Sequence, residues 1–495
     1  MTSPARLATA PRPAAAPPDR RLTAIEELDY LLDQPAEPNL VLWESHSRGR
    51  LDRTALAAAV TEAFATDSGA RRRLVAATRW RRRLYWRSVA PDPAVTPFTE
   101  TAWGTPADLE ALRERLFAWP IPLTDTVARV VLAVGPEHDV LIMQVHHTAF
   151  DGISSLRLLN SIARSYRAHA TGSPPAPDSR PVSGSPPPPS PPTTPTPTSK
   201  PSTPPISPNP PASQRPSTPS THSTPPAPGA TSATSPQPRT GARPGPVTRI
   251  APQGGQPGRP GYGFVLAAEP VPRAAAPGDG PQPTVNDLLV AALCLTIDRW
   301  NTAHGQASGQ ISVTVPVNGR PAGQRWQGDG NLSWLSRVVT GPSDRARPDL
   351  LLRQVAAQTR AARDRGRTAG TDALSRLLAT AWAPVVVKRR VARLTRSLAA
   401  PVLTDTSLVS NLGLLPDPPT FDGRGTEQLW LAPPCPMPRG LAVGAVSVGG
   451  RLYLSVRYRL TLLDQAAAQA FMAGFRAALG ELTRPGQGAP PEAPL

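Results

Sequence analysis

A proline-rich segment divides this chain of 495 residues into two parts that each contain enough apolar residues to fold. Thirty of the 66 prolines lie between Pro174 and Pro260, in a stretch rich in Ser, Thr, Ala and Gly. Such a composition buries too little apolar surface to offset the entropy of ordering, so we expect residues 172–260 to form a disordered linker. A tether of this kind cannot set the geometry of a site. Any site shared by the two parts must depend on direct packing between them.

The composition at the two ends predicts the remaining boundaries. Residues 1–20 are rich in Pro and Ala and contain no apolar run of signal-peptide length, so we expect a disordered tail there and another at residues 485–495. No apolar run approaches the roughly 20 residues that a membrane span needs. Residues 21–171 and 261–484 are therefore expected to form two folded subdomains.

Both subdomains combine helical and strand patterns, which predicts an α+β fold. Asp52, Thr284 and Asp464 are predicted helix N-caps, and Gly449-Gly450 predicts a hairpin turn. Helices are expected near residues 22–34, 52–64, 107–119, 152–169, 284–300, 347–365, 371–398 and 464–482. Strands are expected near residues 40–43, 79–87, 127–134, 140–145, 263–267, 311–317, 406–412, 441–448 and 452–458.

Basic and aromatic residues alternate between residues 79 and 87, as they do in some grooves that bind single-stranded nucleic acid. An edge strand explains the same residues more simply, with Trp80, Leu84 and Trp86 mostly on one face and arginines on the other. One such strand is weak evidence for nucleic-acid binding without a wider fold signature. We favour the edge strand and expect no nucleic-acid partner.

The formal net charge of +17 is compatible with acidic partners such as anionic membranes, coenzyme A phosphates or an acidic carrier protein. However, 51 of the 53 basic residues are arginine, a bias that coding preference could also produce. The arginine-rich helices at 347–365 and 371–398 are expected to carry apolar stripes with basic, solvated outer faces. Two cysteines, Cys294 and Cys435, cannot form a disulfide framework, which fits a cytoplasmic protein.

The stretch from Val140 to Ser155 brings a strand, a turn and a helix together at titratable side chains. Five of the six residues 140–145 are Val, Leu, Ile or Met, as in a strand that is covered on both faces. His146 and His147 follow, and because successive strand side chains point to opposite faces, one imidazole should face a cavity and the other should pack. Asp151 and Gly152 then allow a cap and a tight turn into a helix.

Three chemical roles compete for these side chains. A histidine at a strand end is commonly a buried structural residue, and an aspartate before a helix is commonly a cap. A metal site at His146, His147 and Asp151 is disfavoured, because the histidines diverge and no third convergent ligand is evident, so we expect no metal. The remaining role is a neutral histidine that acts as a general base near pH 7.

The segment His146-His147-Thr148-Ala149-Phe150-Asp151-Gly152 resembles the H-H-x-x-x-D-G signature of thioester-dependent acyltransferases. These include chloramphenicol acetyltransferase, nonribosomal peptide condensation domains and polyketide-associated acyltransferases. The resemblance implies two chloramphenicol acetyltransferase-like α/β subdomains with mixed sheets, arranged as a V-shaped pseudo-dimer with a tunnel between them. The D-F-G-W-G motif of plant-type members is missing, which favours the condensation and polyketide-associated branch.

The resemblance also implies roles for individual residues. His147 would be the base, with His146 and Gly152 supporting the site, and Asp151 would pair with an arginine of the other half. The best match for that arginine is Arg320, in Val317-Asn318-Gly319-Arg320. Three further residues would line the tunnel or contact substrate, because they match the G-N and S-N-x-G segments of relatives: Asn331, Ser410 and Asn411.

By this resemblance the protein is expected to be a free-standing, monomeric acyltransferase of secondary-metabolite or lipid biosynthesis. Acyl-coenzyme A or a phosphopantetheinyl acyl carrier protein would be its co-substrate, and no cofactor would be bound permanently. The acceptor would be a small molecule with a hydroxyl or amine. The alternative is an inactive relative that binds a carrier protein or a biosynthetic partner. The sequence does not identify the acyl donor, its chain length or the acceptor. It also does not decide whether the product is an ester or an amide.

Overall fold

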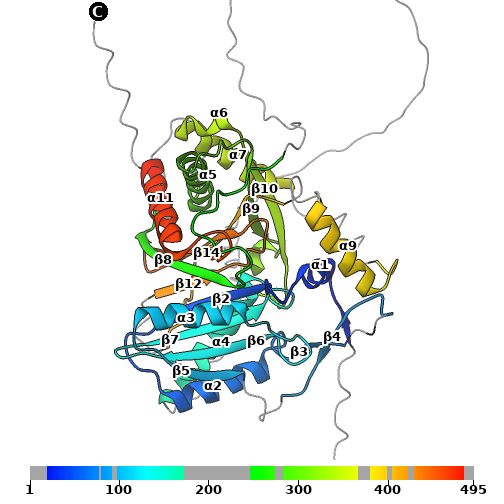
Figure 1. Cartoon of the computed structure of the whole chain (residues 1–495). Helices are drawn as coiled ribbons and strands as arrows, with labels where there is room; N and C mark the ends of the chain where they lie inside the picture. The colour runs from blue at the N-terminus through cyan, green and yellow to red at the C-terminus, as the bar shows by residue number, and fades with distance from the viewer. Residues whose placement is uncertain are drawn as a thin grey trace, which may run out of the picture. The chain divides into compact units, whose positions relative to one another are not determined.

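The computed structural model of the chain (Figure 1) describes residues 19–76, 78, 80–91, 97–171, 246–273, 282–365, 380–398, 404–421 and 428–483. All of them belong to one unit, formed by Met1–Ala176 together with Pro244–Leu495. Residues 172–245 of the predicted linker, residues 1–18 of the predicted first tail and the whole predicted tail 485–495 lie outside the described residues.

The first large sheet has five strands in the order β12-β2-β7-β6-β5. Its central strand β7 is buried along its whole length, as its apolar sequence predicts, and pairs antiparallel with β2 and β6. The strands are β2 Leu40–His46, β5 Phe98–Ala102, β6 Ala128–Val134, β7 Asp139–His146 and β12 Gln428–Ala432. The helices of this part of the chain are α2 Arg53–Thr66, α3 Pro106–Ala118 and α4 Gly152–Thr171.

The second large sheet has six strands in the order β10-β9-β11-β13-β14-β8, and its core is formed with helices α5, α7 and α11 (Figure 1). Its strands are β8 Tyr262–Pro270, β9 Ile311–Asn318, β10 Ser333–Thr340, β11 Ser407–Leu414, β13 Leu441–Val448 and β14 Arg451–Arg459. Its helices are α5 Val285–Ala303, α6 Pro342–Arg345, α7 Pro348–Arg365 and α11 Gln465–Thr483. Both large sheets mix parallel and antiparallel pairs, which confirms the predicted α+β class with mixed sheets.

Local signals placed the ends of several elements correctly. The side chain of Asp52 accepts a hydrogen bond from the backbone of α2, and Thr284 forms a capping box with Asp287 at α5. Gly449 and Gly450 both have positive φ, at 55° and 78°, in the β13–β14 turn. These contacts lie within a few residues of each other, so the sequence alone predicts them.

Strands β10 and β12 were not predicted, and β12 has the larger consequence. It belongs to the second part of the chain but pairs antiparallel with β2 of the first sheet, from Gln428 opposite His46 to Ala432 opposite Leu42. In addition, the guanidinium of Arg457 in β14 donates a hydrogen bond to the carbonyl of Leu40 at 2.6 Å. Direct hydrogen bonds between the two parts of the chain therefore hold them together.

Residues 246–260, the last part of the predicted linker, belong to the folded unit. Residues 246–260 are ordered in the structure, because Ile250 and Ala251 are buried and the backbone of Gln253 bonds to Leu462 and Asp464. Apolar residues in this short run dock on the second core despite its Pro and Gly content. At the first end, Arg20 already pairs with Trp86, so the tail also ends earlier than residue 20.

A small third sheet corrects the prediction of an edge strand at 79–87. Strand β4 (Tyr85–Ser88) is the middle strand, between β1 (Arg20–Arg21) and β3 (Arg72–Leu74). Leu84 and Trp86 are both buried, which fits the predicted shared face, but Trp80 does not join them: it lies in a turn five residues before the strand and is 72% exposed.

Two helices lie side by side at the edge of this region, α1 (Ala24–Leu32) and α9 (Val385–Leu398) (Figure 1). The predicted helix at 371–398 begins only at Val385 within the described residues, since residues 380–384 form bends. Its predicted orientation is also wrong: three of the four valines of α9 are exposed, Val386, Val387 and Val391, while Lys388 is buried. Every helix among the described residues is too short or too polar to cross a membrane.

Candidate active site

The two adjacent histidines lie on opposite sides of the end of β7. His146 is buried, with 2% exposure, and its Nδ1 is 3.2 Å from the backbone nitrogen of Thr148. The side chain of His147 is 24% exposed and lines a cavity. The divergence follows from strand geometry, and it leaves His147 as the imidazole that can meet a substrate.

The Nδ1 side of His147 faces two polar side chains. Nδ1 lies 3.5 Å from Asp29 Oδ2 and 3.1 Å from Asn331 Nδ2. Asn331 donates to Asp29 Oδ2 at 2.7 Å and to the carbonyl of His147 at 3.2 Å, so both of its amide hydrogens have acceptors without using Nδ1. Within the described part of the chain, Nε2 of His147 has no hydrogen-bond partner. This nitrogen is therefore the one available to a ligand.

Asp29 is a site residue that the sequence analysis missed. It lies on α1, and Asp33 caps the end of the same helix with its Oδ2 3.7 Å from His146 Nε2. Each histidine therefore has its own aspartate at this helix. Burial raises the pKa of Asp29 above its ordinary value, and the charges of the two histidines oppose that shift only in part. The spacing of two acidic residues on a predicted helix was visible, but nothing local connected that helix to β7.

Asp151 and Arg320 form the predicted ion pair across the two parts of the chain. The bond is bidentate, with Nη1 to Oδ2 at 2.7 Å and Nη2 to Oδ1 at 3.2 Å, and both side chains are 1% exposed. Asp151 also accepts from the backbone nitrogens of Ser154 in α4 and Leu332 before β10. Burial alone would raise the pKa of Asp151, but the hydrogen bonds and charge of Arg320 outweigh it and hold the pKa below its usual value.

Arg320 also orders the loop that carries Asn331. Its guanidinium donates to the carbonyls of Gln327 at 2.6 Å and Gly328 at 3.2 Å. Gly328 and Gly330 have φ of +88° and +91°, a region that favours glycine. The ion pair therefore determines where Asn331 meets His147.

Gly152 allows β11 to approach the start of α4. A β-carbon at this position would lie 3.1 Å from a methyl of Leu412, closer than ordinary contact. Leu412 belongs to the predicted segment Ser410-Asn411-Leu412-Gly413, in which Gly413 has φ of +77° and donates to Asn411 Oδ1. The structure thus brings two sequence motifs 258 residues apart, from Gly152 to Ser410, to one wall of the site.

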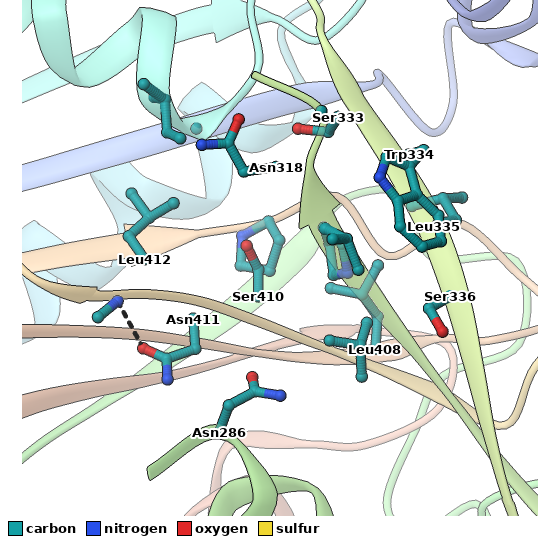
Figure 2. Close-up of a pocket in the computed structure, with 18 of the residues that line it drawn as sticks. Asn286, Asn318, Ser333, Trp334, Leu335, Ser336, Leu408, Ser410, Asn411 and Leu412 are labelled. Carbon is teal, nitrogen blue, oxygen red and sulfur yellow. Dashed lines mark hydrogen bonds between the residues drawn. The ribbon is translucent and has the colours of Figure 1, made fainter. Parts of the chain in front are cut away.

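A cavity of about 1010 Å³ opens beside His147, lined mostly by the second part of the chain. Figure 2 shows its walls: Ser410, Asn411 and Leu412 along β11, Trp334, Leu335 and Ser336 along β10, and Asn286 at the start of α5. Val41, Gly152 and Ile153 of the first part complete the lining near His147. The volume is large enough for a drug-sized ligand.

The structure corrects the predicted place of Asn331. Ser410 and Asn411 line the cavity as predicted, but Asn331 does not line it and is 2% exposed behind the ring of His147. This side chain lies between Asp29 and His147, where it positions the imidazole ring and does not reach the cavity. Among the described residues no three side chains of His, Cys, Asp or Glu are grouped as metal ligands.

The fold is that of condensation domains. The first condensation domain of the calcium-dependent antibiotic synthetase, solved with a substrate analogue, is 16% identical with a TM-score of 0.59, over 94% of this chain and 97% of that chain. The epimerization domain of the third module of tyrocidine synthetase B matches with 14% identity and a TM-score of 0.51, over 94% and 97%. The X-domain solved with OxyB from teicoplanin biosynthesis matches with 15% identity and a TM-score of 0.51, over 98% and 97%.

In sequence, the chain is similar to the uncharacterized protein Rv2305 of Mycobacterium tuberculosis. The two are 29% identical over 452 residues, which cover 87% of this chain and 92% of the relative. No protein-family model matches the sequence. Since the structural neighbours carry different functions in their names, the fold does not decide the activity, and the site has to carry that argument.

Proposed function

We propose that this protein is a condensation-type acyltransferase that moves an acyl group from a coenzyme A or carrier-protein thioester to a hydroxyl or amine. The observation that carries the proposal is the position of His147. Asp29 and Asn331 lie against its Nδ1, while Nε2 has no hydrogen-bond partner among the described residues. The imidazole lines a cavity large enough for an acyl chain. No nucleophilic serine or cysteine is needed for the reaction that follows.

Asp29 selects the tautomer that the reaction requires. A neutral imidazole can take a proton at Nε2 only if its own proton is on Nδ1, and the Asp29 carboxylate is the acceptor that faces Nδ1. Nε2 then removes the proton of the acceptor hydroxyl or amine as that atom attacks the thioester carbonyl. When the tetrahedral intermediate collapses, the C–S bond breaks and the thiolate takes the proton back from the imidazolium. The carboxylate of Asp29 stabilises the imidazolium between these two steps.

The cavity supports an aliphatic acyl group. Apolar side chains from three neighbouring strands cover much of its lining: Val315, Val317, Trp334, Leu335 and Leu408. Burying one methylene contributes about 0.8 kcal/mol, so this wall favours a longer chain over acetyl. The hydroxyl of Ser410 and the amide of Asn411 add polar groups to the same wall (Figure 2).

The proposal is tested with the purified full chain and a panel of acyl-coenzyme A thioesters from acetyl to long-chain. Free thiol release is followed with alcohols and amines as acceptors, and products are identified by mass spectrometry. We expect thiol release that depends on the acceptor and forms an ester or amide in equal amount. Release without acylated product, or no release with coenzyme A and carrier-protein donors alike, would count against acyl transfer.

Replacing Leu408 by tryptophan should shorten the acyl chain that the enzyme accepts. The larger ring would fill part of the cavity, so kcat/KM for a long-chain donor should fall by about tenfold or more, the equivalent of roughly two lost methylenes. Turnover of acetyl-coenzyme A should change little. The matched control is Leu414→Trp, at an exposed position outside the cavity lining, and equal losses for both donors would contradict this use of the cavity.

Replacing Asp29 by asparagine should lower kcat by about 10- to 100-fold. This loss is smaller than the roughly 10²- to 10⁴-fold rate increase that a general base contributes, because His147 itself remains. The amide can donate to Nδ1 and so favours the tautomer whose lone pair faces away from the cavity. KM should change little, because Asp29 does not line the cavity. The control is Asp33→Asn on the same helix, which faces His146 and should leave kcat within about threefold. Equal effects of the two substitutions would argue that Asp29 is only structural.

A further inference from the structure

Most exposed apolar side chains of this protein gather in one place. The described residues contain nine exposed large apolar side chains, and six of them lie on α9 or beside it. We call these six the α9 surface: Trp80, Trp382, Val386, Val387, Val391 and Leu394. The loop and the helix are neighbours, since Val385 donates to the carbonyl of Arg81 at 2.7 Å. None of the six lines the cavity at His147.

Polar contacts hold α9 from its other side. Lys388 is fully buried and donates to Glu27 of α1 at 2.8 Å and to the carbonyl of Arg82 at 2.8 Å. Arg389 lies 4.4 Å over the ring of Tyr30. An ordinary surface helix buries its apolar face and exposes its charges. Here a buried ion pair anchors the helix while its aliphatic side chains face outward.

The two segments that carry the α9 surface are basic, although Asp19 pairs with Arg87 at 3.0 Å beside the first of them. Residues 78–87 and 380–398 contain no Asp or Glu, and the arginines Arg82, Arg83 and Arg390 are exposed among the apolar side chains. Tryptophan with aliphatic side chains and arginine is the combination that binds the interface of an anionic membrane. The apolar groups enter the acyl boundary, tryptophan lies at headgroup depth and arginine meets phosphate.

We propose that the α9 surface binds the surface of an anionic lipid bilayer. The exposed Val387, Val391 and Leu394 recur at helical spacing and so form a ridge along α9. The helix itself lies beside α1 (Figure 1). A fluid bilayer accommodates such a ridge without a matching groove. Each exposed arginine near the surface adds about 1 kcal/mol of attraction to anionic lipid. This proposal does not depend on the acyltransferase activity.

The test uses the full chain and co-sedimentation with vesicles. We expect binding to vesicles of phosphatidylcholine and phosphatidylglycerol in equal parts, at least about tenfold weaker binding to pure phosphatidylcholine, and weakening by salt. A blue shift of tryptophan fluorescence should accompany binding. No binding to the anionic vesicles would overturn the proposal.

Leu394→Ser should weaken binding to these vesicles about tenfold, because one leucine no longer enters the bilayer. Leu414→Ser is the matched control, since Leu414 is 67% exposed and Leu394 59%, and it should bind within about twofold of the unchanged protein. Arg390→Glu tests the charge separately and should weaken anionic binding by at least about tenfold. The proposal fails if Leu394→Ser and Leu414→Ser bind alike. It also fails if an acidic carrier protein binds through Leu394 while the vesicles do not.

Discussion

Replacing His147 by alanine is expected to reduce acyl transfer by about 10²- to 10⁴-fold, the contribution of a positioned general base. Nε2 of this imidazole has no hydrogen-bond partner among the described residues, so it can accept a proton at the cavity. The proposed reaction forms no covalent intermediate that could bypass it. The measurement is kcat for thiol release and product formation at saturating donor and acceptor. Thermal unfolding should change little, because the side chain is 24% exposed and packs only partly.

His146→Ala is the matched control for this substitution. His146 is 2% exposed, so its removal should leave a cavity and lower the free energy of unfolding by about 1–3 kcal/mol. At a temperature where the variant remains folded, kcat should stay within about tenfold of the unchanged protein. Full activity of His147→Ala, or the larger catalytic loss in His146→Ala, would refute the assignment of the base.

Replacing Arg320 by methionine is expected to lower the free energy of unfolding by about 3–5 kcal/mol, the usual cost of breaking a buried ion pair from one side. Asp151 would stay 1% exposed with no cation to compensate its charge. The loop carbonyls of Gln327 and Gly328 would also lose their donor. Urea unfolding of the full chain measures the loss. Activity should fall as well, because this loop positions Asn331 against His147.

Two further variants distinguish the cost of breaking the Asp151–Arg320 pair from the cost of removing any charged side chain. Arg476→Met breaks a surface pair with Glu269, in which the arginine is 51% exposed, and should cost at most about 1 kcal/mol. Adding Asp151→Asn to Arg320→Met should restore part of the loss, since no unpaired carboxylate is then buried. A cost for Arg320→Met no larger than that for Arg476→Met would show that the pair does not hold the two parts together.

The pair should also make stability depend on pH in the acid range. The pKa of Asp151 is lower in the folded protein than its ordinary value of about 3.9, so its contribution is fully present above that value. As pH falls through the lower folded pKa, Asp151 takes up a proton and the contribution is lost. Unfolding measured between neutral pH and about pH 3 should therefore show a smaller acid-dependent loss in the double variant than in the unchanged protein.

The candidate site depends on three connections between distant parts of the chain. Asp151 forms an ion pair with Arg320, and the side chain of Leu412 packs against Gly152. Strand β12 pairs with β2 in the sheet whose strand β7 leads to His147. Each connection is a packed or hydrogen-bonded contact, and none uses the proline-rich segment. These contacts themselves constrain the geometry of the site.

The sequence by itself determined the features that depend only on residues close together in the chain. The buried strand β7, the divergence of His146 and His147, the helix caps and the Gly449-Gly450 hairpin all follow from periodicity or from contacts within one turn. The Asp151–Arg320 pair was predicted through resemblance, since nothing in the spacing of residues 169 positions apart reveals it. Only the tertiary structure decided that β12 pairs with β2, that Asp29 meets His147, and that α9 exposes three of its four valines. A residue's partner across a fold depends on which surfaces bury the most apolar area together, and that depends on the whole chain at once.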